Sequence, residues 1–292
     1  MRLIDVNTLE LKEFFGAHHP RYAILSHTWN GDKEVTFQEW KRRSDDAVKC
    51  KEGYAKIVGA CHRAQTDGLQ YLWCDTNCID KRSSAELSEA INSMFAWYRG
   101  SDVCYAYLAD VGTKTELLAK SRWFTRGWTL QELLAPSKVI FFDRCWKVLG
   151  DKGELAAMIS HITRIHMGAL TDRSTVHCYS IAQRMSWAAN RATSRQEDIA
   201  YCLLGIFDIN MPLLYGEGQK SFTRLQQEII RVSNDQSILA WDLQCSDAHP
   251  WTSALAQSPA GFRFSGSIVK YNRVQHDAYS ITNLGIRVKT SI

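Results

Sequence analysis

The chain has 292 residues, of which 45% are hydrophobic and 23% charged, and its formal net charge is +4. These values are typical of a protein with a substantial core, and ten Trp, eleven Tyr and eleven Phe residues argue against extensive disorder. The compact basic run Lys41-Arg42-Arg43 is too short to indicate nucleic-acid binding and fits a solvated helix end, so we expect no nucleic-acid partner.

The sequence shows no sign of secretion or of a membrane span. No apolar segment follows Met1-Arg2-Leu3-Ile4-Asp5, and no stretch approaches the roughly 18 apolar residues of a span. The nine cysteines are scattered between Cys50 and Cys245, which favours free thiols in a reducing cytosol. Cys74 and Cys78 have no second pair at zinc-ligand spacing, so we expect no metal. The predicted location is cytoplasmic.

The first half of the chain alternates predicted strands and helices. Apolar runs predict buried strands at residues 22–25, 69–74, 103–108 and 139–142. A helix is predicted over Gly53–Asp67, ended by Gly68, and another begins after Ser83, with Glu86 completing a capping box. Strand–helix–strand order implies parallel strands with right-handed crossovers.

The second half is predicted to be mainly helical. Helices are expected at residues 153–162, 181–189, 197–207 and 220–232, with Ser194 and Glu197 as a capping box for the third. From about Gly261 the pattern becomes β, with strands at 262–264, 279–282 and 285–288. We expect an α/β domain over residues 1–148, a helical extension over 149–235, and a β-rich tail over 236–292 packed on the rest.

Polar and aromatic side chains follow each of the first three predicted strands. They are Ser26, His27 and Trp29 after the first, Asp75 and Asp80 after the second, and Arg122, Arg126, Trp128 and Glu132 after the third. A parallel α/β sheet binds ligands at the carboxyl ends of its strands. This mixture suits a ligand that has a charged sugar-phosphate part and a flat ring.

No familiar catalytic signature is present. The sequence lacks the G-x-G-x-x-G, P-loop and G-x-S-x-G motifs. A Ser-His-Asp or Cys-His set can be assembled from Ser26, His27, Cys78 and Asp75. Nine histidines and nine cysteines make such combinations easy to find, so this set carries little weight.

Three blocks of sequence resemble the heterokaryon-incompatibility (HET) domain of filamentous fungi. They cover residues 22–29, residues 72–81 followed by 86–94, and residues 121–136, in the order that the family has. Residues 195–202 and 214–218 resemble the segment that commonly follows the domain. Asn77 departs from the pattern, where a small residue or Cys is expected.

The resemblance implies a self/non-self recognition protein whose activation kills the cell. HET domains are distantly similar to TIR domains, which implies a flavodoxin-like, mostly parallel sheet with helical elaboration and a small C-terminal β-tail. In TIR domains a Glu within a Trp-x-x-x-Glu-Leu segment serves NAD+ cleavage, and the matching stretch here runs from Trp128 to Leu133. The implied substrate is NAD+, with no separate cofactor. The implied partners are further copies of the chain on activation and an unidentified protein activator.

The chemistry of this cleavage is consistent with a carboxylate at the site. Nicotinamide leaves from a cationic pyridinium, so no general acid is required, and one carboxylate can stabilise the oxocarbenium-like state. We assign this role to Glu132 with Asp75. Ser26, His27 and Asp80 are predicted to contact the substrate. Arg122 and Arg126 are predicted to bind pyrophosphate, and Trp29, Trp123 or Trp128 to stack on a ring.

Each of these residues also has a purely structural interpretation. Glu132 can form a capping box with Thr129, Asp75 can cap a turn, and Trp128 can belong to the core. His27 can be a buried structural histidine, Asp80 can pair with Lys81, and Arg122 and Arg126 can form surface salt bridges. Two other functions remain open: a non-enzymatic module that associates through its aromatic surface, and a nucleotide or nucleic-acid hydrolase with a metal on Asp75 and Asp80.

Overall fold

The computed structural model describes residues 1–16, 19–112, 115–242, 254–270, 280–282 and 285–287. The chain divides into two compact units. The first contains Met1–Trp123 and Ala135–Ala156, and the second contains Phe124–Leu134 and Ala157–Ile292. This division assigns Phe124–Leu134 to the second unit. The domain boundaries expected at residues 148 and 235 stay predictions.

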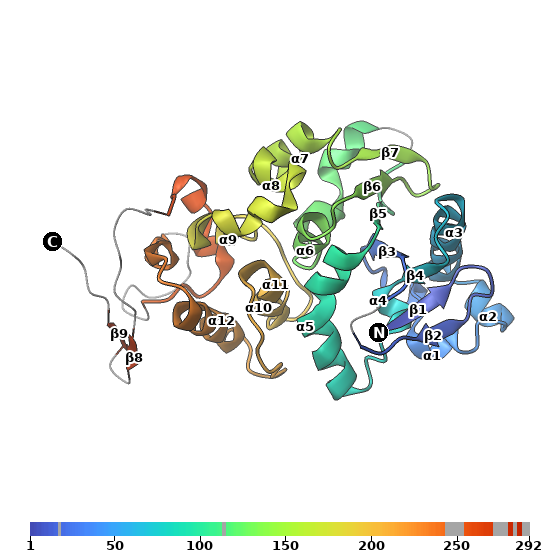
Figure 1. Ribbon diagram of the computed structural model, residues 1–292, viewed down its shortest axis with the longest axis horizontal. Helices are drawn as coiled ribbons and strands as arrows, with labels where there is room; N and C mark the ends of the chain where they lie inside the picture. Colours follow the sequence, from blue (N-terminus) through green and yellow to red (C-terminus); the bar gives the residue numbers. More distant parts are fainter. Residues whose placement is uncertain (17–18, 113–114, 243–253, 271–279, 283–284, 288–292) are drawn as a thin grey trace. The chain divides into compact units, whose positions relative to one another are not determined.

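The first unit is built on a seven-stranded mixed sheet (Figure 1). Its strands are β1 (Arg2–Asp5), β2 (Leu11–Glu13), β3 (Tyr22–His27), β4 (Tyr71–Trp73), β5 (Val103–Tyr107), β6 (Val139–Phe142) and β7 (Val148–Asp151), in the order β2-β1-β4-β3-β5-β6-β7. The four predicted strands are confirmed as β3, β4, β5 and β6, and they run parallel. The antiparallel strands β1, β2 and β7 were not predicted.

The order of the parallel strands identifies the edge at which sheets of this kind commonly bind ligands. Along the chain the parallel strands follow one another as β3, β4, β5 and β6, but across the sheet they lie in the order β4-β3-β5-β6. The connections therefore change direction at β3, between its neighbours β4 and β5. Open α/β sheets bind ligands outside the carboxyl ends of their strands at such a switch point. The residues that follow β3, β4 and β5 thus occupy the expected position of a site.

Helices complete the first unit. They are η1 (Gly31–Lys33), α1 (Phe37–Trp40), α2 (Asp46–Lys49), α3 (Glu52–Thr66), α4 (Asp75–Cys78), α5 (Ser84–Gly100) and η2 (Thr115–Lys120), while η3 (Arg122–Thr125) crosses the boundary between the units. The helix predicted at 53–67 is confirmed as α3, and Gly68, with a φ of 73°, follows its end. Ser83 caps α5 by accepting the Glu86 amide, but the Glu86 carboxylate accepts the Asp80 amide instead of closing the capping box.

The second unit is helical. Its elements are α6 (Thr129–Leu134), α7 (Ala156–Thr163), α8 (Met167–Thr171), η4 (Arg173–Cys178), α9 (Ile181–Ser186), α10 (Asp198–Tyr201), α11 (Leu204–Phe207), α12 (Lys220–Val232), η5 (Gln236–Leu239), η7 (Pro259–Phe262), η8 (Ser265–Ser267), β8 (Ser280–Thr282) and β9 (Gly285–Arg287). The predicted helix 220–232 is confirmed as α12. The antiparallel pair β8–β9 confirms two of the predicted β segments, although Tyr279 and Val288 lie outside the described residues.

Three predictions for the second unit were wrong. The helix expected over 197–207 is interrupted, forming α10 and α11. The Ser194–Glu197 capping box does not form, because the Glu197 carboxylate accepts the amides of Gly216 and Gly218 instead. The strand expected at 262–264 is absent, since Phe262 ends the 3₁₀ helix η7. Among the described residues, no helix has the length and apolar character that crossing a bilayer requires.

Candidate functional site

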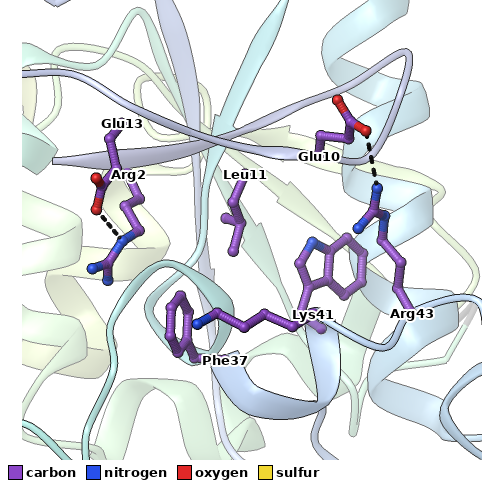
Figure 2. A pocket seen from close by; sticks show the side chains of 8 residues that line it. Arg2, Glu10, Leu11, Glu13, Phe37, Lys41 and Arg43 are labelled. Carbon is purple, nitrogen blue, oxygen red and sulfur yellow. Dashed lines mark hydrogen bonds and ion pairs between the residues drawn. The ribbon is translucent and has the colours of Figure 1, made fainter.

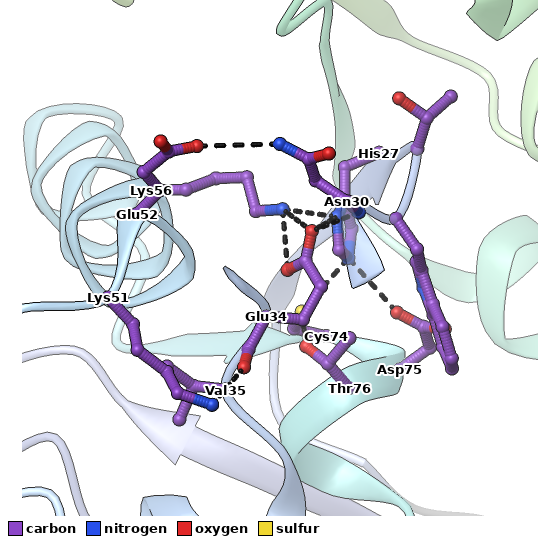
Figure 3. A network of polar contacts seen from close by, with 12 residues as sticks. His27, Asn30, Glu34, Val35, Lys51, Glu52, Lys56, Cys74, Asp75 and Thr76 are labelled. Atoms are coloured by element: carbon purple, nitrogen blue, oxygen red, sulfur yellow. Dashed lines mark hydrogen bonds and ion pairs between the residues drawn. The ribbon is translucent and has the colours of Figure 1, made fainter. Parts of the chain in front are cut away.

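Two features of the first unit are candidates for binding: a groove and a polar network. The groove has a volume of about 570 Å³ and lies between β2 and α1 (Figure 2). None of the predicted site residues lines it. The polar network lies at the carboxyl ends of β3 and β4, where the site was predicted (Figure 3).

The network is centred on His27 and Asp75. His27 is the last residue of β3, and Asp75 opens α4 two residues after β4 ends. Because β3 and β4 are parallel neighbours, the two side chains meet, with 3.1 Å between His27 Nε2 and Asp75 Oδ1. The predicted proximity of residues after these two strands is therefore observed.

A buried ion pair supports the other side of the histidine ring. Lys56 Nζ, from α3, lies 2.7 Å from His27 Nδ1 and 2.7 Å from each carboxylate oxygen of Glu34 (Figure 3). The side chains of Lys56 and Glu34 are only 7% and 6% exposed. An ammonium group can only donate, so Nδ1 accepts and the ring proton sits on Nε2, which donates to Asp75. Burial and Lys56 act to lower the pKa of His27, but Cys74 and Asp75 outweigh them and raise it to about 9. A charged ring would turn a second donor toward the Lys56 ammonium at 2.7 Å, so we assign the neutral ring from this contact.

Asp75 connects this network to the surface. Its Oδ2 atom accepts the Trp29 indole N–H at 3.0 Å and the Lys81 ammonium at 3.3 Å. Lys81 Nζ also lies 3.3 Å from the centroid of the Trp29 ring. Burial acts to raise the pKa of Asp75, but Lys81 and His27 outweigh it and hold that pKa well below its usual range. Since 45% of Trp29 is exposed, an ionised carboxylate, a cation and an indole face solvent together.

The other candidates of the first unit have different positions. Ser26 is fully buried and accepts the Trp123 indole N–H at 2.8 Å, so it lies in the core. Asp80 accepts from Gln38 Nε2 at 2.8 Å and from the Arg82 amide, and Lys81 is paired with Asp75 instead. Arg122 lies beside the network, with Nη2 3.3 Å from the Trp29 carbonyl oxygen.

The remaining candidates, Arg126, Trp128 and Glu132, belong to the second unit. Arg126 donates to Ser194 Oγ at 3.2 Å, and the Trp128 indole donates to Asp198 Oδ2 at 3.4 Å. Glu132 lies in α6 and is 7% exposed. Burial lowers the pKa of Arg191 to about 10, and the charge of Glu132 opposes that shift. The charge of Glu132 thus acts on Arg191, a residue of its own unit.

The later motif, residues 195–202 with 214–218, forms the scaffold around Trp128. Asp198 accepts from both Trp128 and the Tyr215 hydroxyl. Glu217, which the sequence alone did not explain, accepts the Tyr201 hydroxyl at 2.8 Å and pairs with Arg224. The motif thus stabilises the loop before α12.

The network does not suit a metal ion. His27, Cys74 and Asp75 offer ligand atoms within 4.8 Å of one another. The nitrogen that faces Cys74 and Asp75 is Nε2, which carries the ring proton as long as Lys56 donates to Nδ1. A metal would need that nitrogen deprotonated and would also be repelled by Lys56. The donor set therefore fits a hydrogen-bonded network better than a metal centre.

The sequence analysis did not identify Glu34 and Lys56 as site residues, and it considered Lys81 only as a partner of Asp80. A signal for Lys56 was present in α3. The buried stripe of that helix contains Ile57, Ala60, Cys61 and Ala64, and Lys56 lies four residues before Ala60 on the same face. A lysine on an apolar stripe indicates a buried charge that needs a partner.

Comparison with known proteins gives a consistent result. A family model described as heterokaryon incompatibility protein (HET) matches residues 22–117. The chain is also similar to the vegetative incompatibility protein HET-E-1 of Podospora anserina, with 45% identity over 240 residues. That match covers 78% of this chain and 17% of the relative, so the chain spans only a small part of the relative's length. No solved structure gives a significant match.

Proposed function

We propose that this chain, which belongs to the heterokaryon incompatibility (HET) family, is the effector module of a fungal incompatibility reaction and kills by cleaving NAD+. The products would be nicotinamide and ADP-ribose or its cyclic form. The biological part of the proposal is supported by the 45% identity to a protein named for vegetative incompatibility. The chemical part is supported by the site of the first unit.

One observation carries the chemical proposal. An ionised Asp75, the exposed Trp29 and the cation Lys81 share one position at the carboxyl ends of β3 and β4. The parallel strands lie in the order β4-β3-β5-β6, which corresponds to the order 2-1-3-4 of flavodoxin-like sheets. This order supports a TIR-like fold, and the cluster lies next to the switch point of the connections. Lys81 and Arg122 offer positive charge to a pyrophosphate, and Trp29 offers a surface to a flat ring.

Two carboxylates are candidates for the reaction, and they have different environments. Asp75 is held ionised, and its side chain is 22% exposed, so it is available to the ribose hydroxyls of a bound nucleotide. Glu132 lies in the Trp128–Leu133 segment that matches the TIR pattern, and it is 7% exposed. We propose that Glu132, which the TIR-like segment implies, carries the catalytic charge; Asp75 is the alternative that the first unit itself offers, and each is tested by its own variant. Either group stabilises the developing oxocarbenium ion without a general acid.

The test is nicotinamide release from NAD+ by the purified chain, measured across protein concentrations so that activation by clustering is detected. Glu132→Gln is expected to lower kcat by roughly 10²-fold or more. The same loss in Asp75→Asn, with full turnover in Glu132→Gln, would assign the reaction to Asp75 instead. Glu228→Gln is the matched control, because Glu228 lies on α12 and pairs with the exposed Arg231. Circular dichroism spectra establish that each variant is folded.

The outcomes separate the alternatives. Full turnover in Glu132→Gln eliminates Glu132 as the catalytic carboxylate. No nicotinamide release by the wild-type chain at any concentration contradicts the enzymatic proposal. Cell killing that persists without turnover, and that depends on surface substitutions, would then favour the non-enzymatic, self-associating module.

A further inference from the structure

The groove between β2 and α1 has a defined shape. Leu11 lies in its middle, and the ring of Phe37 and the buried Trp40 belong to its lining (Figure 2). An ion pair lies at each end: Arg2 with Glu13 at 2.6 Å, and Arg43 with Glu10 at 3.6 Å. The Trp40 indole N–H already donates to the Leu9 carbonyl, so it needs no partner from a ligand. The middle of the groove therefore suits an apolar side chain.

The strand beside the groove has a free edge. Among the residues that the structure describes, β2 is the terminal strand of the sheet and pairs only with β1. Met1 and Phe14 exchange backbone hydrogen bonds, and the Asp5 amide donates to the Glu10 carbonyl. By the antiparallel alternation, the backbone groups of Leu11 and Glu13 point away from β1. The side chains of the same two residues line the groove.

The cations near the groove differ in whether a carboxylate is paired with them. Arg2 and Arg43 are bound to carboxylates, whereas the contact described for Lys41 is the face of Phe37, with Nζ 4.4 Å from the ring centroid. Lys41 is exposed, and so is Arg42 next to it. Among the residues that the structure describes, no carboxylate is paired with either cation. This part of the groove therefore favours a negatively charged group.

We propose that the β2–α1 groove is a docking site for an extended polypeptide segment of a partner protein. The segment adds a strand to the edge of β2, using the outward backbone groups of Leu11 and Glu13. One apolar side chain enters the groove beside Leu11, and an acidic side chain two residues away meets Lys41, because alternate residues of a strand share a face. The partner is thus recognised by an apolar-x-acidic pattern, independently of the NAD+ proposal.

A second copy of the chain fits this edge less well. In a two-fold antiparallel pairing through Leu11 and Glu13, Lys12 would stand directly opposite Lys12 of the other copy. Like charges opposite each other in neighbouring strands are destabilising. Each Glu13 would also face the Leu11 of the other copy instead of a cation.

The experiment measures binding of two end-blocked, fluorescent heptapeptides to the full chain by fluorescence anisotropy. One has the sequence Thr-Asp-Thr-Ile-Thr-Asp-Thr, and the other has Lys in place of both Asp residues. The acidic peptide is expected to bind at least tenfold more tightly. Lys41→Glu should abolish this preference, whereas Lys138→Glu, which changes another exposed lysine of the same unit, should leave it unchanged.

Amide hydrogen exchange tests the strand addition itself. The amides of Leu11 and Glu13 should exchange rapidly in the free chain and slowly with the acidic peptide, while the amide of Lys12, which faces β1, is protected in both states. Equal affinity for the two peptides, or no binding up to about 1 mM, would overturn the proposal. Protection of Leu11 and Glu13 that rises with protein concentration, without any peptide, would assign the edge to a second copy instead.

Discussion

The two units of the molecule bury positive charge in opposite ways. In the first unit, Lys56 binds both oxygens of Glu34 and a nitrogen of His27. In the second unit, the bonds described for the buried guanidinium groups of Arg184 and Arg191 are to neutral acceptors: carbonyl oxygens and, for Arg191, the Thr129 hydroxyl. Within the described part of the chain, one nitrogen of each arginine, Nε of Arg184 and Nη2 of Arg191, has no hydrogen-bond partner.

The pKa values reflect this difference in surroundings. Burial lowers the pKa of Arg184 and of Arg191 to about 10, because the charged form is poorly compensated. Lys56 has a carboxylate in direct contact, and the resulting network fixes the orientation of His27 and Asp75. Both charges of a buried ion pair must be desolvated, but removing one partner is strongly destabilising because it leaves the other charge buried and unpaired. A buried cation without a counter-charge contributes less to stability, because its desolvation is poorly compensated. The candidate site therefore depends on the first arrangement.

The largest expected loss of stability follows from breaking the ion pair between Lys56 and Glu34 in the first unit. Lys56→Met leaves the Glu34 carboxylate buried without its counter-charge. We expect the free energy of unfolding to fall by about 3–5 kcal/mol, measured by urea denaturation at neutral pH. Lys33→Met is the control, because Lys33 and its partner Glu52 have side chains that are 56% and 65% exposed.

The double variant Glu34→Gln/Lys56→Met sharpens the test. Removing both charges should recover most of the lost stability, because no uncompensated carboxylate remains. The exposed-pair control should change stability by less than about 1 kcal/mol. If the single and double variants are equally unstable, the contact of Lys56 with His27, and not its pairing with Glu34, is what stabilises this region.

The second largest expected effect is a dependence of the free energy of unfolding on pH, which arises from Asp75. Lys81 and His27 hold the folded-state pKa of this carboxyl below the unfolded value of about 3.9. The stabilisation is therefore complete above that unfolded value and is lost as the pH falls toward the folded-state pKa. Its size is on the order of 1–3 kcal/mol.

The measurement is the free energy of unfolding of the wild type and of Asp75→Asn, from pH 5 down into the acid range. The difference between the two proteins should shrink as the pH falls, because the wild type loses the charge that the variant lacks. The lowered pKa values of Asp5 and Glu39 affect both proteins alike and cancel. A constant difference would show that Asp75 acts through hydrogen bonds alone.

The parallel part of the sheet was predictable, because doubly covered strands are continuous apolar runs. Tyr22–Leu25 and Val139–Phe142 have no polar interruption, and both became strands of the sheet. The edge strands were missed because β2 contains one apolar residue, Leu11, between charged neighbours. A three-residue strand has no detectable period, and only its pairing with β1 identifies it.

The candidate site, like the sheet, was predictable only in part. Topology brought His27, Trp29 and Asp75 together, because residues that follow parallel strands meet at one edge. Burial was not predictable: Ser26 follows the same strand pattern as His27 yet binds Trp123 in the core. Lys56 is 29 residues from His27 along the chain, and only the packing of α3 on β3 and β4 shows that they touch. The capping interpretation of Glu197 was wrong because the loop at Gly216–Gly218 takes its carboxylate.

The smallest expected effect tests the cation of the second unit. Arg184 donates to the Ile206 carbonyl at 2.8 Å, and its guanidinium lies 4.7 Å from the centroid of the Phe207 ring. Arg184→Met keeps an apolar contact with that ring and removes a charge whose Nε lacks a partner, but it leaves the carbonyl without a donor. Because these contributions oppose each other, we expect a loss of roughly 1 kcal/mol or less in the same urea experiment. A loss as large as that of Lys56→Met would mean that neutral carbonyl oxygens stabilise a buried cation as well as a carboxylate does, and the contrast between the two units would fail.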